Sequence, residues 1–180
     1  MIVELLAVSA MTFGEQASSE PEGCSVAVRY VERLVADDPG RWVFNPQPDT
    51  WSTDLDRPFG GAGPVLDAAF REKIEATPAR SAVESCGSLR ELLVSRGIPH
   101  SLEAVSDAVW ENDPEKFSRL EPFQRAVVTI TLPVMNDNQS EAFVQVGVVA
   151  APQRCAFWSY TLDVTQPDLP VTRRFSGPIC

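Results

Sequence analysis

The last third of the chain alternates apolar and polar residues in the way typical of β-strands. Three runs rich in β-branched and aromatic residues follow one another, at 126–134, 142–149 and 156–164. The first two are separated by the polar cluster 136–140, whose Asn, Asp and Ser side chains favour a turn. Runs of this kind, bounded by turn residues, predict consecutive antiparallel strands. A fourth strand is expected at 171–175.

The preceding part of the chain instead repeats apolar residues at the spacing of a helix. This pattern predicts four helices, which begin at Ser25, near Pro64, at Ser88 and at Ser101. Ser88 is followed three residues later by Glu91, and this spacing is the pattern of a capping box.

Between the first two helices, the sequence suggests a short strand at 41–44 and a loop at 45–64 that is held by Trp51 and Phe59. The element order predicts an α+β fold, in which N-terminal helices pack on a C-terminal, three- to four-stranded antiparallel sheet. The length of 180 residues suits one domain, which we place at 19–180.

The start of the chain carries one strongly apolar run, at residues 2–13. The run is too short to span a bilayer and is typical of the hydrophobic core of a signal peptide. Val8-Ser9-Ala10 has the small residues of a cleavage site, although Glu4 interrupts the run and no basic residue precedes it. We therefore expect residues 1–18 to be the remnant of a signal peptide or an apolar N-terminal segment, and the protein to be exported. The alternative is that the run forms the first strand or helix of the fold.

The four cysteines predict two structural disulfides. They are widely spaced, at Cys24, Cys86, Cys155 and Cys180. A zinc site would need closely spaced ligands or several histidines, and the chain has only one histidine. Of the three pairings, we prefer Cys24–Cys86 with Cys155–Cys180, because each is local to one half of the chain. The alternative is four free thiols in a reducing compartment.

The formal net charge of −10 limits the partners. A nucleic-acid-binding surface needs a basic footprint for the phosphates, so no nucleic-acid partner is expected. The simplest role of this charge is solubility. The functional alternative is a basic protein partner, whose approach an acidic surface would speed.

Residues that could carry catalysis are few. His100 is the only histidine, and no serine or cysteine motif accompanies it. The Gly-rich segment 59–64 lacks the Lys and Ser/Thr of a phosphate-binding loop. The sequence therefore assigns no catalytic residue, no metal ligand and no cofactor. The candidate binding residues are Trp158 and Tyr160, which share one face of a predicted strand and would line either a binding surface opposite the helices or the core.

Residues 126–164 resemble the C-terminal sheet of small exported bacterial proteins of unknown function. The similarity lies in the strand that ends at Leu132-Pro-Val134, the polar turn 136–140 and the strand 142–149. The link at 150–155 departs from the pattern, because it has one Cys and no Gly. The resemblance implies export and structural disulfides, and it implies no catalytic residues.

The leading interpretation is an exported, non-enzymatic domain that binds another protein. The alternative is a small-molecule binding or hydrolytic protein with a curved, cone-like sheet of the nuclear-transport-factor-2 kind. That alternative predicts a concave pocket containing a carboxylate such as Asp163 or Glu141. A third interpretation is a structural protein associated with the cell envelope.

Overall fold

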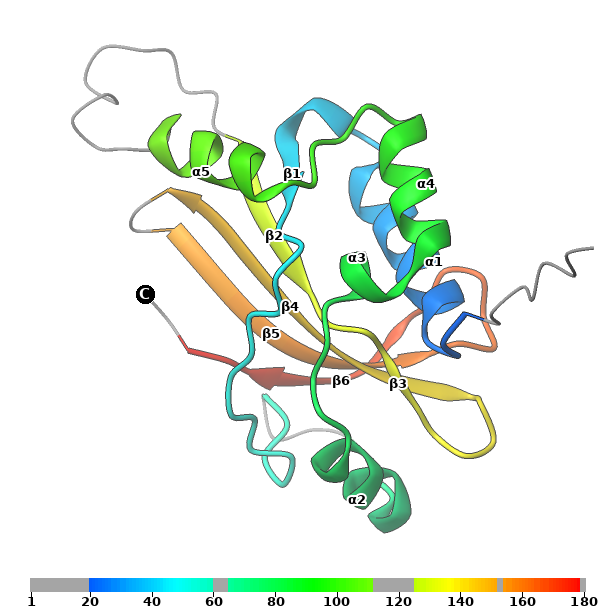
Figure 1. Cartoon of the computed structure of the whole chain (residues 1–180). Helices are drawn as coiled ribbons and strands as arrows, with labels where there is room; N and C mark the ends of the chain where they lie inside the picture. Colours follow the sequence, from blue (N-terminus) through cyan, green and yellow to red (C-terminus); the bar gives the residue numbers. More distant parts are fainter. Residues whose placement is uncertain (1–19, 60–64, 112–124, 152–153, 179–180) are drawn as a thin grey trace, which may run out of the picture.

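The computed structural model describes residues 20–59, 65–111, 125–151 and 154–178. Its helical elements are α1 (Cys24–Val35), the 3₁₀ turn η1 (Pro39–Arg41), α2 (Ala68–Ala76), α3 (Ala82–Ser85), α4 (Gly87–Ser95) and α5 (Leu102–Glu111). Its strands are β1 (Trp42–Phe44), β2 (Ala126–Ile130), β3 (Val134–Met135), β4 (Glu141–Ala151), β5 (Arg154–Asp163) and β6 (Val171–Ser176). The fold is a mixed α+β arrangement around one sheet (Figure 1).

The sheet has six strands within the described ranges, and it is partly parallel. Its order is β1-β2-β4-β5-β6, and β3 pairs with β4. β1 runs parallel to β2, whereas the other pairs are antiparallel. The expectation of a three- to four-stranded, purely antiparallel sheet was therefore wrong, although the α+β class is correct.

One cause of the larger sheet is a break in the run that was expected to form its first long strand. The backbone N–H of Leu132 donates to Arg80 O at 2.7 Å, which draws the chain away from its neighbour. Pro133 has no N–H to give to the ladder. Pairing resumes where Val134 lies opposite Phe143, so the run yields both β2 and β3.

The second cause is the segment Trp42–Phe44, which lies beside β2 in parallel register, with Trp42 opposite Ala126. A parallel neighbour far away in the sequence leaves no hairpin signal, because its connection includes helices and long loops. The short strand itself was expected, but its place in the sheet was not.

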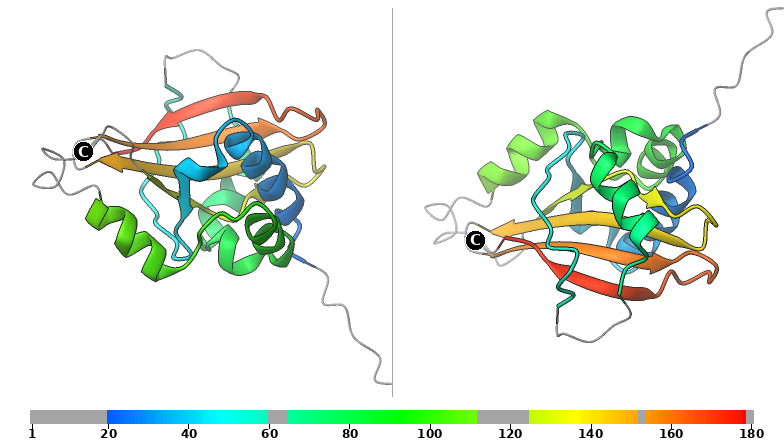
Figure 2. Two further views of the ribbon diagram at one scale, coloured as in Figure 1. Left: turned by 90° about the horizontal axis from the view of Figure 1, so that it is seen from above. Right: turned by 90° about the horizontal axis from the view of Figure 1, so that it is seen from below.

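One face of the sheet, here called the helix face, is apolar. It packs against α1, α3 and α4, and its buried side chains include Phe44, Val128, Ile130, Val144, Val146 and Leu162. Side chains along a strand alternate between faces, so every second residue of β4 points to this core. Figure 2 shows α1 near the end of the sheet that carries the turns after β3 and β5, and α5 near the opposite end.

The opposite face, here called the cleft face, is chemically different. It carries six of the seven buried polar side chains among the described residues: Thr129, Thr131, Gln145, Ser159, Thr161 and Arg173. Cross-strand register confirms that they share a face, because Gln145 lies opposite Ser159 and Thr161 lies opposite Arg173. Three elements cover this face: α2 over Phe143 and Phe175, α5 over Val127, and the extended segment 50–59.

The disulfide Cys24–Cys86 is present, as the preferred pairing predicted. It joins the first residue of α1 to the residue that precedes α4, and both cysteines are buried. Cys155 is disulfide-bonded as well. Cys180 lies outside the described residues, and so does the apolar segment 1–18.

The helices differ from the expectations in three places: α2 begins at Ala68, the short helix α3 was not expected, and the cap of α4 is different. α5 is capped by Ser101, whose Oγ accepts from the Ala104 N–H at 3.1 Å, as predicted. The capping box expected at Ser88 was wrong, because α4 begins at Gly87 and Ser88 lies inside it. No helix within the described ranges has the length and apolar character needed to cross a membrane.

Candidate functional site

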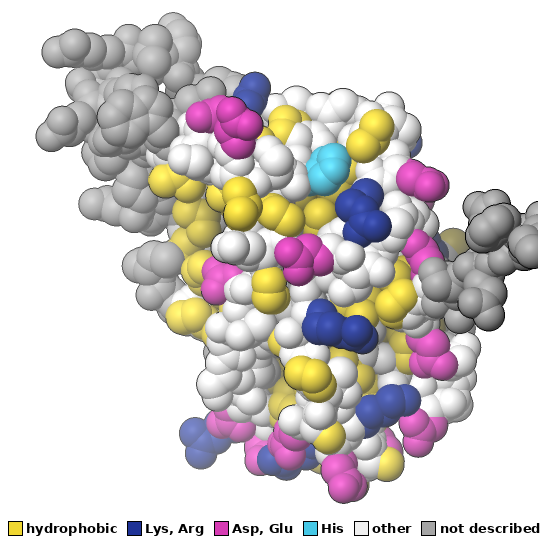
Figure 3. All heavy atoms as spheres, in the orientation of Figure 1, with side chains coloured by type: hydrophobic (Ala, Val, Ile, Leu, Met, Phe, Trp, Pro, Cys, Tyr) yellow, Lys and Arg dark blue, Asp and Glu magenta, His cyan; other side chains and the backbone are white. Residues whose placement is uncertain are grey.

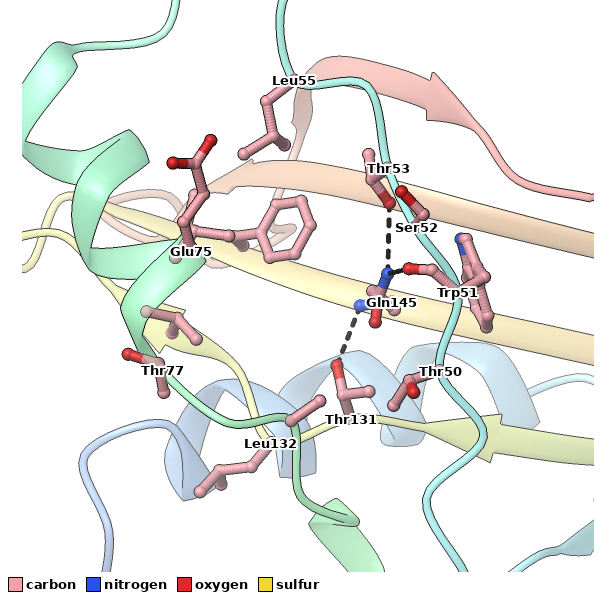
Figure 4. Close-up of a pocket in the computed structure, with 14 residues that line it drawn as sticks. Thr50, Trp51, Ser52, Thr53, Leu55, Glu75, Thr77, Thr131, Leu132 and Gln145 are labelled. Carbon is pink, nitrogen blue, oxygen red and sulfur yellow. Dashed lines mark hydrogen bonds between the residues drawn. The ribbon is translucent and has the colours of Figure 1, made fainter.

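A cleft of about 400 Å³ opens on the cleft face of the sheet, between α2 and the segment 50–55. Figure 4 shows side chains from these elements converging above β4 and the end of β2. The cleft is lined by Thr50, Trp51, Ser52, Thr53, Leu55, Ile74, Glu75, Thr77, Ala79, Thr131, Leu132, Val134, Phe143 and Gln145. Its volume lies within the range of small-molecule sites in proteins, about 300–1,000 Å³.

Gln145 forms the centre of the floor. Its side chain is only 7% exposed, and its Nε2 donates to Trp51 O at 2.9 Å and to Thr53 Oγ1 at 3.1 Å. A carbonyl oxygen can only accept, so the nitrogen of the carboxamide must be the atom that faces Trp51. The side chain is therefore fixed in one orientation, with its Oε1 turned away from these two partners (Figure 4).

That Oε1 is an acceptor left available to a ligand. No group among the described residues donates to it, and it is not among the enclosed polar atoms that lack a partner. It is therefore open to the cleft. A buried side chain with fixed donors and an open acceptor is the kind of polar group that selects a ligand in a small pocket.

Two hydroxyl groups extend this polar floor. Thr131 Oγ1 accepts from the Gln145 backbone N–H at 3.0 Å, and Thr53 Oγ1 lies 2.6 Å from Ser159 Oγ. The first bond ties Thr131 to β4, and the second ties the segment 50–55 to β5. A satisfied network of this kind rigidifies its surroundings, because an unpaired buried polar group would be costly.

An aromatic contact anchors the segment that forms one wall. Trp51 packs edge-to-face on Phe157 with ring centroids 5.1 Å apart. Gly147 lies under this pair, and a β-carbon there would stand 2.8 Å from the Phe157 ring. The absence of a side chain at Gly147 thus lets the 50–55 segment approach the sheet closely.

The opposite wall is α2 and the residues that follow it. Asp67 caps the helix, because its Oδ1 accepts from the N–H groups of Ala69 and Phe70 at 3.0 and 3.1 Å. Glu75 on the same helix accepts from Arg71 Nε at 2.9 Å. The Arg71 guanidinium also bonds Asp56. The bond to Glu75, followed by the bond to Asp56, raises the pKa of Arg71. The negative charge of Glu75 is therefore compensated at the rim.

The lining gives the cleft a nearly neutral, hydrogen-bonding character. Among the described residues of the lining, Glu75 is the one ionisable side chain, and none is Lys, Arg or His. Threonine and serine hydroxyls, an amide and apolar side chains make up the rest. His100 lies elsewhere, with Nδ1 3.1 Å from Ile98 O, and is visible at the surface in Figure 3. The described residues contain no group of three or more side chains that could hold a metal ion.

The residues singled out from the sequence lie on the other face. Tyr160 packs against the core of the helix face, and Trp158, two residues earlier on β5, points to the same side. Trp158 and Tyr160 therefore lie on the helix face, the side of the sheet that packs against α1. They are not part of the cleft face. Of the two carboxylates expected in a pocket, Glu141 pairs with Arg173 at 2.8 Å and Asp163 bonds Thr165 in a turn. Neither lines the cleft.

The functional residues that sequence reasoning missed are Gln145, Thr131 and Thr53. One signal was present in the sequence. Gln145 is a polar residue within the apolar run of β4, and it shares one face of the strand with Phe143 and Gly147. No protein-family model, curated protein or solved structure matches the chain. The resemblance of residues 126–164 to exported bacterial proteins thus stays a prediction.

Proposed function

We propose that this protein binds a small, uncharged polar molecule in the cleft, without changing it chemically. The observation that carries the proposal is the buried Gln145, whose carboxamide is fixed by Trp51 and Thr53 and whose Oε1 is open. Hydroxyl or amide N–H groups of a ligand would donate to this oxygen, while the threonine hydroxyls can both donate and accept.

The lining favours an uncharged ligand over an ion. A charged ligand loses its hydration on entry and needs an opposite charge to replace it. An anion would find no opposite charge, because the described lining contains no cation. A cation would find only Glu75, which is already paired with Arg71. Leu55, Ile74 and Phe143 would cover the apolar part of the ligand.

The residues that line the cleft also favour binding over catalysis. General acid–base or nucleophilic catalysis needs a titratable or activated group within reach of the ligand. Glu75 is the one ionisable group in the described part of the lining, and its side chain is 56% exposed. The hydrolytic variant of the pocket interpretation is thus less well supported than the binding variant.

We further infer that the protein acts in an oxidising compartment, outside the reducing cytosol. Disulfides persist in such compartments, and the Cys24–Cys86 bond joins two elements of the main core. An exported binding protein remains consistent with the acidic charge of the chain. The protein partner favoured by the sequence stays a prediction.

The experiment is a titration followed by tryptophan fluorescence, since Trp51 lines the cleft. The probes are uncharged sugars, polyols and amides, each paired with a carboxylate or phosphate derivative of the same skeleton. We expect saturable binding of at least one uncharged probe and weaker binding of its charged partner. Preference for the charged member of each pair, or no response to any probe, would overturn the proposal.

Two tryptophan substitutions locate the binding. Ala79→Trp places a bulky side chain at the rim of the cleft, at an exposed position where folding is not at risk. Ala36→Trp adds the same bulk at an exposed position after α1, outside the cleft. The first variant should lose at least tenfold in affinity and the second should bind as the unmodified protein does. Equal binding by both variants would show that the ligand lies elsewhere.

A further inference from the structure

A second pocket, of about 460 Å³, lies on the helix face between α1 and the hairpin of β5 and β6. It is here called the Arg174 pocket. Its chemistry is unlike that of the cleft, because two arginines and two tyrosines line it. These four residues are Tyr30 and Arg33 from α1, and Tyr160 and Arg174 from the hairpin.

Aromatic rings hold Arg174. Its guanidinium carbon lies 4.9 Å from the centroid of Trp158 and 5.5 Å from that of Tyr160. Phe59 supports Trp158 from the edge, with centroids 5.6 Å apart. A guanidinium stacked in this way keeps its in-plane N–H groups free for an oxyanion. Within the described ranges, the Arg174 side chain has no hydrogen bond or ion pair.

Groups from α1 approach the same point. Tyr30 and Arg33 are three residues apart, so they lie on one side of the helix. Burial raises the pKa of the Tyr30 phenol, as does Tyr160, whereas the positive charges of Arg174 and Arg33 oppose this rise. The Tyr30 side chain lines the same pocket as these three groups. It stays protonated at neutral pH and can donate a hydrogen bond.

The remaining walls are the turn between β5 and β6 and apolar side chains. The turn also places Asp168 in the lining, so the two arginines leave the pocket with one net positive charge. Arg29 Nη1 donates to Val164 O at 3.2 Å, and Arg33 donates to Asp168 O. These bonds fasten the turn between β5 and β6 to α1. Arg33 has five N–H donors, so one bond leaves others for a ligand. Leu34, Leu169 and Val171 supply the apolar lining.

From these contacts we infer that the Arg174 pocket is an anion-binding site for a small organic molecule that carries a carboxylate or phosphate group. Arg174 and Arg33 bind the oxyanion, while Tyr30 and Tyr160 donate hydrogen bonds to it. The apolar part of the molecule lies against Leu169 and Val171. The site is positively charged, whereas the chain as a whole carries a net charge of −10. It is independent of the cleft, which lies on the other face of the sheet.

Titration calorimetry with phenyl phosphate, benzoate, inorganic phosphate and phenol tests this inference. Phenyl phosphate or benzoate should bind, and phenol should not, because it lacks the charge. The stronger of the two organic anions identifies the oxyanion, and weaker binding of inorganic phosphate shows that the apolar wall contributes. Affinity should fall as salt is added, since an exposed arginine is screened. Binding of phenol as tight as that of the anions would overturn the inference.

Variants then assign the binding to Arg174. Arg174→Gln should lower the affinity for the organic anion at least tenfold. Arg174→Lys should retain part of the affinity, because a point charge replaces the forked N–H groups of the guanidinium. Arg96→Gln, at an exposed position after α4, is the matched control and should have no effect. Unchanged affinity in Arg174→Gln, or an equal loss in Arg96→Gln, would refute the site. Ala79→Trp should leave anion binding intact, so a failure here is separate from a failure of the cleft proposal.

Discussion

Gly147 on β4 lies directly opposite Phe157 on β5, and a β-carbon at Gly147 would stand 2.8 Å from two carbons of the Phe157 ring. The same β-carbon would stand 3.7 Å from Trp51, which packs edge-to-face on Phe157. The Phe157 ring thus contacts both β4 and the segment 50–55. The close approach of the 50–55 segment to the sheet depends on this glycine.

We expect Gly147→Ala to lower the free energy of unfolding by about 1–3 kcal/mol, as overpacking of a filled site does. Urea denaturation followed by circular dichroism measures the change. Gly40→Ala is the control, because a β-carbon there meets only Asp38 at 3.7 Å. In a Phe157→Leu background the cost should shrink, since the colliding ring is gone. An undiminished cost in that background would contradict the steric explanation.

The Cys24–Cys86 bond closes a loop with a sequence separation of 62 residues. The chain-entropy relation for a loop of this length gives a stabilisation of about 4 kcal/mol. Cys24→Ala combined with Cys86→Ala should lower the free energy of unfolding by about this amount. Urea denaturation without reductant measures it. A loss below about 1 kcal/mol would mean that the elements around the bond already restrict the unfolded chain.

Thr53 ties the cleft wall to the sheet through Gln145 and Ser159. Thr53→Val keeps the shape and removes the hydroxyl, so the buried partners lose an interaction worth about 1–3 kcal/mol. Thr50→Val is the matched control, since Thr50 lines the same cleft but is exposed. Thermal unfolding and the tryptophan titration should distinguish the two variants. Identical melting temperatures and affinities would show that the hydroxyl network does not hold the wall.

The sequence predicted elements whose signals are local. The polar cluster 136–140 and the strands around it were found because alternation and turn residues act over a few neighbours. The cap at Ser101 was found for the same reason. The disulfide Cys24–Cys86 followed from the number and spacing of the cysteines.

Features set by distant contacts could not be predicted. Ser88 has the spacing of a helix cap, but its hydroxyl instead lies 2.6 Å from Glu20 Oε2, because the disulfide brings the two segments together. The short helix α3 was missed, because four residues are too few to show a periodic pattern. Its cap is Ser81, whose Oγ accepts from the Glu84 N–H at 3.4 Å. The cleft was missed because Gln145 and Thr53 are 92 residues apart, and only the folded chain joins them.

The pairing of Glu20 with Ser88 makes the start of α4 sensitive to pH. Glu20 Oε2 accepts from Ser88 Oγ, and Oε1 accepts from the Ser88 backbone N–H at 2.7 Å. These bonds lower the pKa of the Glu20 carboxyl in the folded protein. A lowered pKa stabilises the fold above the ordinary glutamate pKa of about 4.3, and this contribution is lost as the pH falls through the folded value.

Glu20→Gln should therefore be less stable than the unmodified protein at pH 7, and the difference should disappear towards pH 3. Urea denaturation at a series of pH values measures this difference. Glu22→Gln is the matched control, because Glu22 is exposed and makes no hydrogen bond to α4 among the described contacts. Its curve should run parallel to that of the unmodified protein. A difference in Glu20→Gln that persists unchanged at pH 3 would mean that the carboxylate charge does not stabilise the start of α4.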